Sequence, residues 1–176
     1  MALTSANRSS DLHALDLNFR HYTSEGVVFV LPTLTKTRRS GPPKESFYCR
    51  FKEVILCPVH TLQIYEQRTE NLRMKNSNES RLFISFQKPH KPVCSSSIAR
   101  WIKTVLASAG VDTDHFKAHS TRAAAVSATK SAGVSLRDIM TMADWSCETT
   151  LTRFYHKPVV QSEFGQAVLS QHTSSW

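Results

Sequence analysis

Three short stretches in the last third of the chain decide its fold and chemistry: His119-Ser120-Thr121-Arg122, then Ala143-Asp144-Trp145, then Arg153-Phe154-Tyr155-His156-Lys157-Pro158. A histidine and an arginine three residues apart in a helix lie on one face of that helix. A tyrosine that follows a second helix could bring its hydroxyl group to the same face. Together these residue types indicate a site that acts on a phosphate group without a metal ion.

The composition is that of an ordinary globular domain with an excess of positive charge. The chain has 176 residues and a formal net charge of +8, enough length for one domain with its own core. Excess lysine and arginine favour an anionic partner, and nucleic acid is the commonest one, although a basic protein without such a partner is the simpler alternative. No apolar run approaches the length of a membrane span, so no membrane partner is expected.

The cysteines and histidines give no sign of a disulfide framework or a metal site. The four cysteines are scattered, with no pair separated by two residues, which favours reduced intracellular thiols. The histidines outside the 119–122 stretch lack metal-ligand spacing; these are His60, His90, His115 and His156 among others. Cofactors and metals are therefore not expected.

Periodicity and breaker residues predict a mainly helical α+β fold with a small antiparallel sheet. The first half is predicted to contain a helix within residues 3–16, strands at 27–31 and 46–51 joined as a hairpin, and a weaker strand at 54–56. A basic turn at 35–43 links the two main strands. The predicted helices that follow are 58–68, one from 95–97 to Gly110, one from His119 to Gly133, one capped by Ser135, and two at 149–155 and 159–171.

Breaking a phosphodiester bond without a metal requires several side chains at one point. A nucleophile must attack the phosphorus, cations must neutralise the growing negative charge, and an acid must protonate the departing oxygen. Arginine suits the second role because its planar fork donates two hydrogen bonds and stays charged. Lysine suits the acid role, and tyrosine suits attack when cations surround it.

The order and spacing of such residues resemble the tyrosine recombinase (phage integrase-like) catalytic domain over nearly the whole chain. That family's pattern is arginine, lysine, His-x-x-Arg, histidine or tryptophan, then tyrosine. The positions that match are Arg8, Lys36, His119, Arg122, Trp145 and Tyr155. Lys36 is the least specific match, because Arg38, Arg39 and Lys44 lie near it.

The resemblance implies a role for each matched residue. Arg8 and Arg122 would hold the scissile phosphate, and Lys36 would protonate the departing 5′-oxygen. His119 would accept and return the proton of Tyr155, the nucleophile, which would form a 3′-phosphotyrosyl link. Trp145 would help to hold the phosphate but cannot relay protons, because an indole is only a donor.

Two departures from the family pattern refine this expectation. Tyr155 lies 10 residues after Trp145, and with the Phe-Tyr-His-Lys-Pro stretch this looks more like recombinases of eukaryotic mobile elements of the DIRS and crypton kinds. The nucleus is then the expected compartment. The family's N-terminal DNA-clamping domain has no counterpart here, so residues 1–176 are expected to be a catalytic domain from a longer protein.

The resemblance also implies double-stranded DNA as substrate and a homo-oligomer on that DNA, with residues 160–171 docking on a neighbouring subunit. An alternative is a catalytically idle DNA-binding module derived from a mobile-element recombinase. A topoisomerase-like enzyme shares the chemistry but normally carries larger DNA-wrapping regions. Taken singly, each matched residue has a plain structural explanation, and the prediction rests on all six together.

Overall fold

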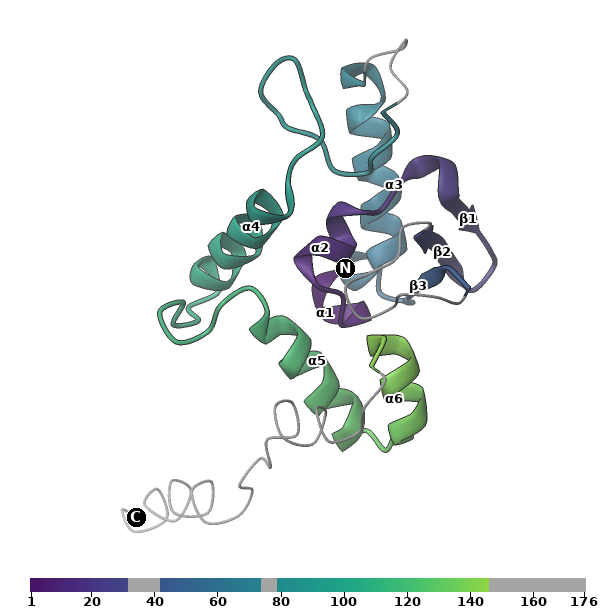
Figure 1. Cartoon of the computed structure of the whole chain (residues 1–176), viewed down its shortest axis with the longest axis vertical. Helices are drawn as coiled ribbons and strands as arrows, with labels where there is room; N and C mark the ends of the chain where they lie inside the picture. The colour runs from purple at the N-terminus through teal and green to yellow at the C-terminus, as the bar shows by residue number, and fades with distance from the viewer. Residues whose placement is uncertain (32–41, 74–78, 146–176) are drawn as a thin grey trace, which may run out of the picture.

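The computed structural model describes residues 1–31, 42–73 and 79–145, which form helices around a small sheet (Figure 1). The helices and strands run in the order α1 (Ala2–Ser5), α2 (Ser9–His13), η1 (Leu17–Phe19), β1 (Arg20–Tyr22), β2 (Gly26–Leu31), β3 (Lys44–Cys49), η2 (Val54–Leu56), α3 (Pro58–Thr69), η3 (Glu70–Leu72), α4 (Ser95–Ser108), α5 (Ser120–Ser131) and α6 (Leu136–Ala143). The predicted α+β, mainly helical fold with a small antiparallel sheet is confirmed.

The sheet is antiparallel, in the order β1-β2-β3. Strands β2 and β3 pair from Gly26 with Cys49 to Leu31 with Lys44, so they form the predicted hairpin. Gly26 is required at its end of the hairpin, because a Cβ there would lie 2.2 Å from the carbonyl oxygen of Tyr48. The sheet therefore places Lys44 opposite Leu31, at the end of the hairpin from which the connecting residues 32–43, Lys36 among them, run in the sequence.

The main core lies between the sheet and helices α2, α3 and α4. Its fully buried members come from strands, helices and the segments that follow α2 and α3, and include Leu15, Phe29, Tyr48, Val59 and Leu82. The rings of Phe29 and Tyr48 meet edge to face, with centroids 6.1 Å apart. Burial of this apolar surface provides the main driving force for this part of the fold.

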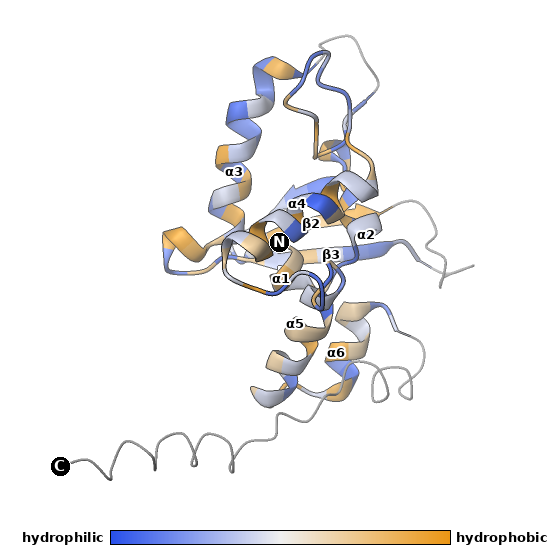
Figure 2. Cartoon of the chain, turned by 90° about the vertical axis from the view of Figure 1, so that its left-hand side faces the viewer, coloured by the Kyte–Doolittle hydropathy of each residue, from blue (hydrophilic) through white to orange (hydrophobic). Residues whose placement is uncertain are grey.

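A second, smaller core joins α1 to α5 and α6. Ala6, Val126 and Ile139 are its buried members, and Trp145 packs against it. Figures 1 and 2 show α5 and α6 side by side at the lower end of the molecule, below α1 and away from the far end of α3. The first and last described segments of the chain therefore meet in this smaller core.

The helix ends follow the predicted signals. Pro58 is the first residue of α3, and Ser135 caps α6 by accepting a hydrogen bond from the Asp138 amide at 3.1 Å. Gly110 and Gly133 follow α4 and α5 with φ of 78° and 82°, conformations that glycine adopts without strain. In the described residues no helix is long and apolar enough to cross a membrane.

Some local predictions were wrong. Residues 54–56 form a 3-10 turn with Ile55 85% exposed, so their apolar pattern does not mark a strand. The short helix predicted around Arg8 within residues 3–16 is instead two helices, because Ala6 adopts a left-handed conformation and ends α1, and α2 begins just after Arg8. Strand β1 was not predicted at all. The predicted helices at 149–155 and 159–171 lie outside the described residues.

Candidate functional site

Arg122 is the most deeply buried charged residue of the proposed site, with 2% of its surface exposed. It lies in the first turn of α5, and Nη1 donates a hydrogen bond to the carbonyl oxygen of Ala6 at 2.7 Å. Nη2 donates to the carbonyl oxygen of Ala143. The guanidinium thus joins α5 to the C-terminal ends of α1 and α6.

Both carbonyl groups are available because each belongs to a helix end. The last carbonyls of a helix have no partner within the helix, so a cation there satisfies them. Ala6 and Asp144 close α1 and α6 in left-handed conformations, with φ of 50° and 52°. The left-handed conformation costs a residue other than glycine about 1 kcal/mol or more, and the hydrogen bonds to Arg122 help to offset this cost.

Trp145 covers one face of the Arg122 guanidinium. The guanidinium carbon lies 4.4 Å from the centroid of the indole ring, a cation–π contact. The indole is half-buried and is also part of the smaller core. Two of the residues that the resemblance singled out, far apart in the sequence, are therefore in direct contact.

Arg8 lies close to this pair through the backbone. It immediately precedes α2, and its amide donates to Oδ2 of Asp11 at 3.0 Å. Arg8 follows Ala6 by two residues, so its Cα lies within about 7 Å of the residue whose carbonyl binds Arg122. The Arg8 side chain is half-buried and makes no hydrogen bond to another residue in the described segments.

His119 is the cap residue before α5, and its carbonyl accepts the Arg122 amide at 3.1 Å. Its backbone angles are helical, with φ of −72° and ψ of −14°. The His119 side chain is exposed, whereas Arg122 is buried. That the two side chains share one helix face therefore stays a prediction. Lys36 and Tyr155 lie outside the described residues.

A buried polar network beside Arg8 was missed at the level of sequence. Lys44 is 5% exposed, and its Nζ lies 2.9 Å from Oδ2 of Asp11 and 3.1 Å from Oδ1 of Asn7. The Asn7 amide group donates in turn to the hydroxyls of Ser46 and Tyr48, at 3.0 and 2.8 Å. The capping pattern from Arg8 to Asp11 could have indicated the acid. Nothing in the sequence marks Lys44 as buried, because lysine is almost always exposed.

The network also perturbs one tyrosine. Burial raises the pKa of Tyr48 to about 12, and the Asp11 carboxylate acts in the same direction, while hydrogen bonds from Ser5 and Asn7 oppose the shift. Tyr48 is 1% exposed and stays protonated at neutral pH. Its hydroxyl therefore serves as a structural acceptor, unsuited to attack on a substrate.

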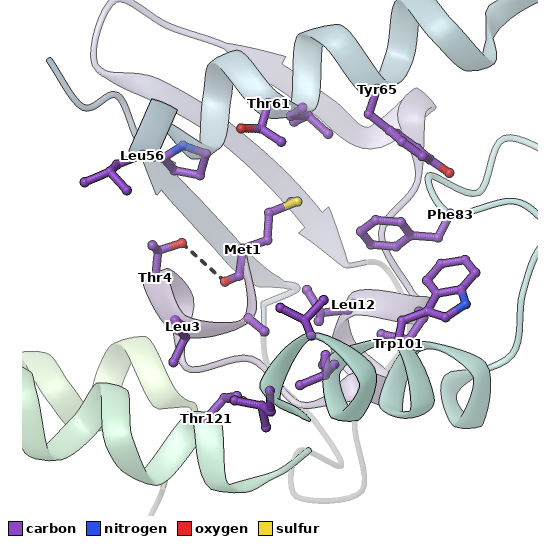
Figure 3. Close-up of a pocket in the computed structure, with 17 residues that line it drawn as sticks. Met1, Leu3, Thr4, Leu12, Leu56, Thr61, Tyr65, Phe83, Trp101 and Thr121 are labelled. Carbon is purple, nitrogen blue, oxygen red and sulfur yellow. Dashed lines mark hydrogen bonds between the residues drawn. The ribbon is translucent and has the colours of Figure 1, made fainter. Parts of the chain in front are cut away.

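A separate hollow of about 450 Å³ opens between α1, α3 and α4 (Figure 3). Tyr65, Phe83 and Trp101 form one side of it, and Leu3 and Leu56 the other. No charged side chain lines this hollow, so it does not suit a phosphate group. In the part of the chain that the structure describes, no group of histidine, cysteine and acidic residues could hold a metal ion.

Comparisons with known proteins identify the family and the fold. The sequence pattern of the phage integrase family matches residues 1–159. No curated protein is similar enough in sequence to count as a relative. The chain belongs to the phage integrase family.

Solved structures show the same fold at low sequence identity. XerA recombinase has a TM-score of 0.67 and 15% identity, over 99% of this chain and 57% of that one. XerH recombinase bound to palindromic difH substrate has a TM-score of 0.66 and 12% sequence identity, over 99% of this chain and 43% of that one. The Tn1549 transposon integrase in complex with circular intermediate DNA has a TM-score of 0.55 and 14% sequence identity, over 97% of this chain and 54% of that one. The chain thus spans about half the length of these proteins.

Proposed function

We propose that this chain is the catalytic part of a site-specific DNA recombinase that cuts and rejoins strands through a 3′-phosphotyrosyl intermediate. The observation that carries the proposal is the contact between Arg122 and Trp145, with the Arg8 backbone two residues from a carbonyl that Arg122 binds. Membership of the phage integrase family supports it.

In this proposal the reaction proceeds by transfer of a phosphoryl group and needs no external energy source. The Tyr155 oxygen attacks the phosphorus, the bond to the 5′-oxygen breaks, and Lys36 supplies the proton to that oxygen. Arg8 and Arg122 neutralise the non-bridging oxygens, while the exposed imidazole of His119 accepts the phenol proton. The freed 5′-hydroxyl of a partner strand then attacks the phosphotyrosine and restores a phosphodiester.

The structure adds a condition to this sequence of steps. A guanidinium that is 2% exposed cannot meet a phosphate arriving from solvent. Arg122 must therefore be uncovered when DNA binds, and we expect the indole of Trp145, which covers one face of the guanidinium, to move. DNA is expected to shift a population of closed sites to open ones.

We further propose a homo-oligomer on double-stranded DNA, a nuclear location and descent from a eukaryotic mobile element of the DIRS or crypton kind. The phosphate-binding cations and the net charge of +8 support a DNA partner. The solved XerH and Tn1549 proteins of the same fold were captured with DNA. The lineage rests on the Trp145 to Tyr155 spacing and the Phe-Tyr-His-Lys-Pro stretch.

A nicked suicide DNA substrate tests the proposal, because loss of a short fragment after cleavage traps the covalent intermediate. The wild-type chain is expected to form a protein–DNA adduct that resists denaturation, and Tyr155→Phe is expected to form none. An adduct that persists in Tyr155→Phe would contradict the proposal.

The second candidate is a DNA-binding module that does no chemistry. Burial of Arg122 against two backbone carbonyls favours it, because a purely structural arginine would look the same. Salt-sensitive DNA binding with no adduct at any DNA concentration would select this second function.

A further inference from the structure

The buried ammonium of Lys44 is a feature that the proposed reaction does not use. Lys44 is the first residue of β3, 5% exposed, and its ion pair with Asp11 is shielded from water on both sides. A buried charge is retained at a cost unless it is paired and hydrogen-bonded. The position of Lys44 therefore needs an explanation beyond solubility.

The two groups that Lys44 binds lie on either side of Arg8. Its Nζ donates to Oδ1 of Asn7, the residue before Arg8, and to Oδ2 of Asp11, three residues after it. The same Asp11 oxygen accepts the Arg8 amide. A chain of two hydrogen bonds through one carboxylate oxygen thus connects the Lys44 ammonium to the Arg8 backbone.

Lys44 is also connected to the other parts of the site. It pairs with Leu31 at the base of the β2–β3 hairpin, whose turn contains Lys36. It borders a hollow of about 640 Å³ that Trp145 and Asp144 also line. Lys44 thus joins the hairpin to the Arg8 segment, beside a hollow that it shares with Trp145.

We infer that Lys44 is a positioning residue: through Asn7 and Asp11 it fixes the Arg8 backbone and holds the base of the hairpin against it. Lys44 does not touch the phosphate in this account. Its charge organises two segments from which separate cations, Arg8 and Lys36, reach one phosphate. The role in cleavage rests on the proposed function, but the restraint on the Arg8 backbone does not.

The first test is amide hydrogen exchange of the intact chain, with no DNA present. Lys44→Met removes the charge and keeps a chain of similar length, and Lys52→Met, at an exposed lysine after β3, is the matched control. Exchange of the Arg8 amide is expected to speed up about tenfold or more in Lys44→Met, with the Phe29 amide of β2 unchanged. An Arg8 amide as protected as in the wild type would overturn the inference.

If Lys44→Met does not fold, Lys44→Arg provides the same test with the charge retained. The longer, planar guanidinium cannot reproduce both ammonium contacts, so the Arg8 amide is expected to exchange faster than in the wild type and more slowly than in an uncharged variant. Wild-type protection in Lys44→Arg is compatible with the inference only if Lys44→Gln loses that protection. Protection of the Arg8 amide at the wild-type level in both variants would overturn the inference.

The second test separates positioning from proton transfer. A suicide substrate with sulfur in place of the departing 5′-oxygen has a leaving group that needs no proton. Lys44→Met is expected to cleave the oxygen and sulfur substrates about a hundredfold more slowly than the wild type, because a misplaced clamp affects both. Lys36→Ala is expected to recover on the sulfur substrate.

Each outcome has one meaning. Recovery of Lys44→Met on the sulfur substrate would make Lys44 itself the acid and overturn the positioning role, as would wild-type rates on both substrates. A wild-type chain that cleaves neither substrate would count against the proposed function, and the exchange of the Arg8 amide alone would then decide the role of Lys44.

Discussion

The guanidinium carbon of Arg122 lies 4.4 Å from the centroid of the Trp145 ring. The same guanidinium donates hydrogen bonds to the backbone carbonyl groups of Ala6 and Ala143, at the ends of α1 and α6. This arrangement gives one side chain two duties. It holds three helices together in the closed state, and in the proposed reaction it must turn toward a phosphate.

Arg122→Ala is expected to lower the free energy of unfolding as well as abolish cleavage. The substitution leaves the buried carbonyls of Ala6 and Ala143 without their donor, and each such loss costs about 1 to 3 kcal/mol. Urea denaturation measures the change, with Arg137→Ala on the exposed face of α6 as the control. Equal stability of the two variants would show that Arg122 does not hold the helices together.

Trp145→Phe is expected to keep the aromatic contact with Arg122 and lose only the indole N–H. Stability should change by about 1 kcal/mol or less, because a benzene ring still covers the guanidinium. If the indole donates to the phosphate, single-turnover cleavage should fall by about tenfold to a hundredfold. Trp101→Phe, in the apolar hollow, should leave cleavage unchanged, and an undiminished rate in Trp145→Phe would remove the indole from the chemistry.

Tyr48→Phe is expected to destabilise the chain in a pH-dependent manner. At pH 8 the loss should be about 1 kcal/mol, since Asn7 loses a buried acceptor. Because burial raises the pKa of Tyr48 to about 12, its hydroxyl contributes fully below the unfolded pKa of about 10 and less as the pH rises through 12. Urea titrations between pH 8 and 11.5 should therefore show the gap between the two proteins narrowing, and a constant gap would argue against the raised pKa.

Cys94 is expected to react with iodoacetamide at a lower pH than an ordinary thiol. Hydrogen bonds from the hydroxyls of Ser96 and Ser97 lower its pKa to about 6, so the thiolate is present above that pH. Mass spectrometry at pH 6.5 should find Cys94 modified before Cys49, which is also exposed. Replacing both serines by alanine should narrow the difference between the two thiols, and modification of Cys49 first in the wild type would contradict the prediction.

The sequence was sufficient to predict the helices with clear boundary signals. Pro58 and Ser135 begin helices, and Gly110 and Gly133 follow them, because local chemistry decides these positions. The apolar run at 54–56 was wrongly predicted to be a strand, because it forms a short exposed turn that pairs with no strand in the described residues. Ala6 carries no signal for its left-handed conformation, which tertiary contacts with Arg122 stabilise.

The site was predicted more completely in its residue types than in its geometry. The family resemblance placed Arg122 and Trp145 in one site, and their side chains are in contact; Arg8 lies near them only through its backbone, so its part in the site stays a prediction. It also placed His119 and Arg122 on one face, and this stays a prediction: His119 is the exposed cap residue of α5, and Arg122 is buried in its first turn. The ion pair between Lys44 and Asp11 was not predicted, because the burial of a lysine depends on contacts between segments far apart in the sequence.

Identification of the residue that carries the DNA is the most direct measurement of the central claim. The chain has four tyrosines, and Tyr48 is buried within a hydrogen-bonded network. After reaction with a suicide substrate and digestion by trypsin, mass spectrometry should find a nucleotide on the peptide that begins at Phe154, linked through Tyr155. A nucleotide on any other peptide, or none on a chain that binds the DNA tightly, would contradict the account.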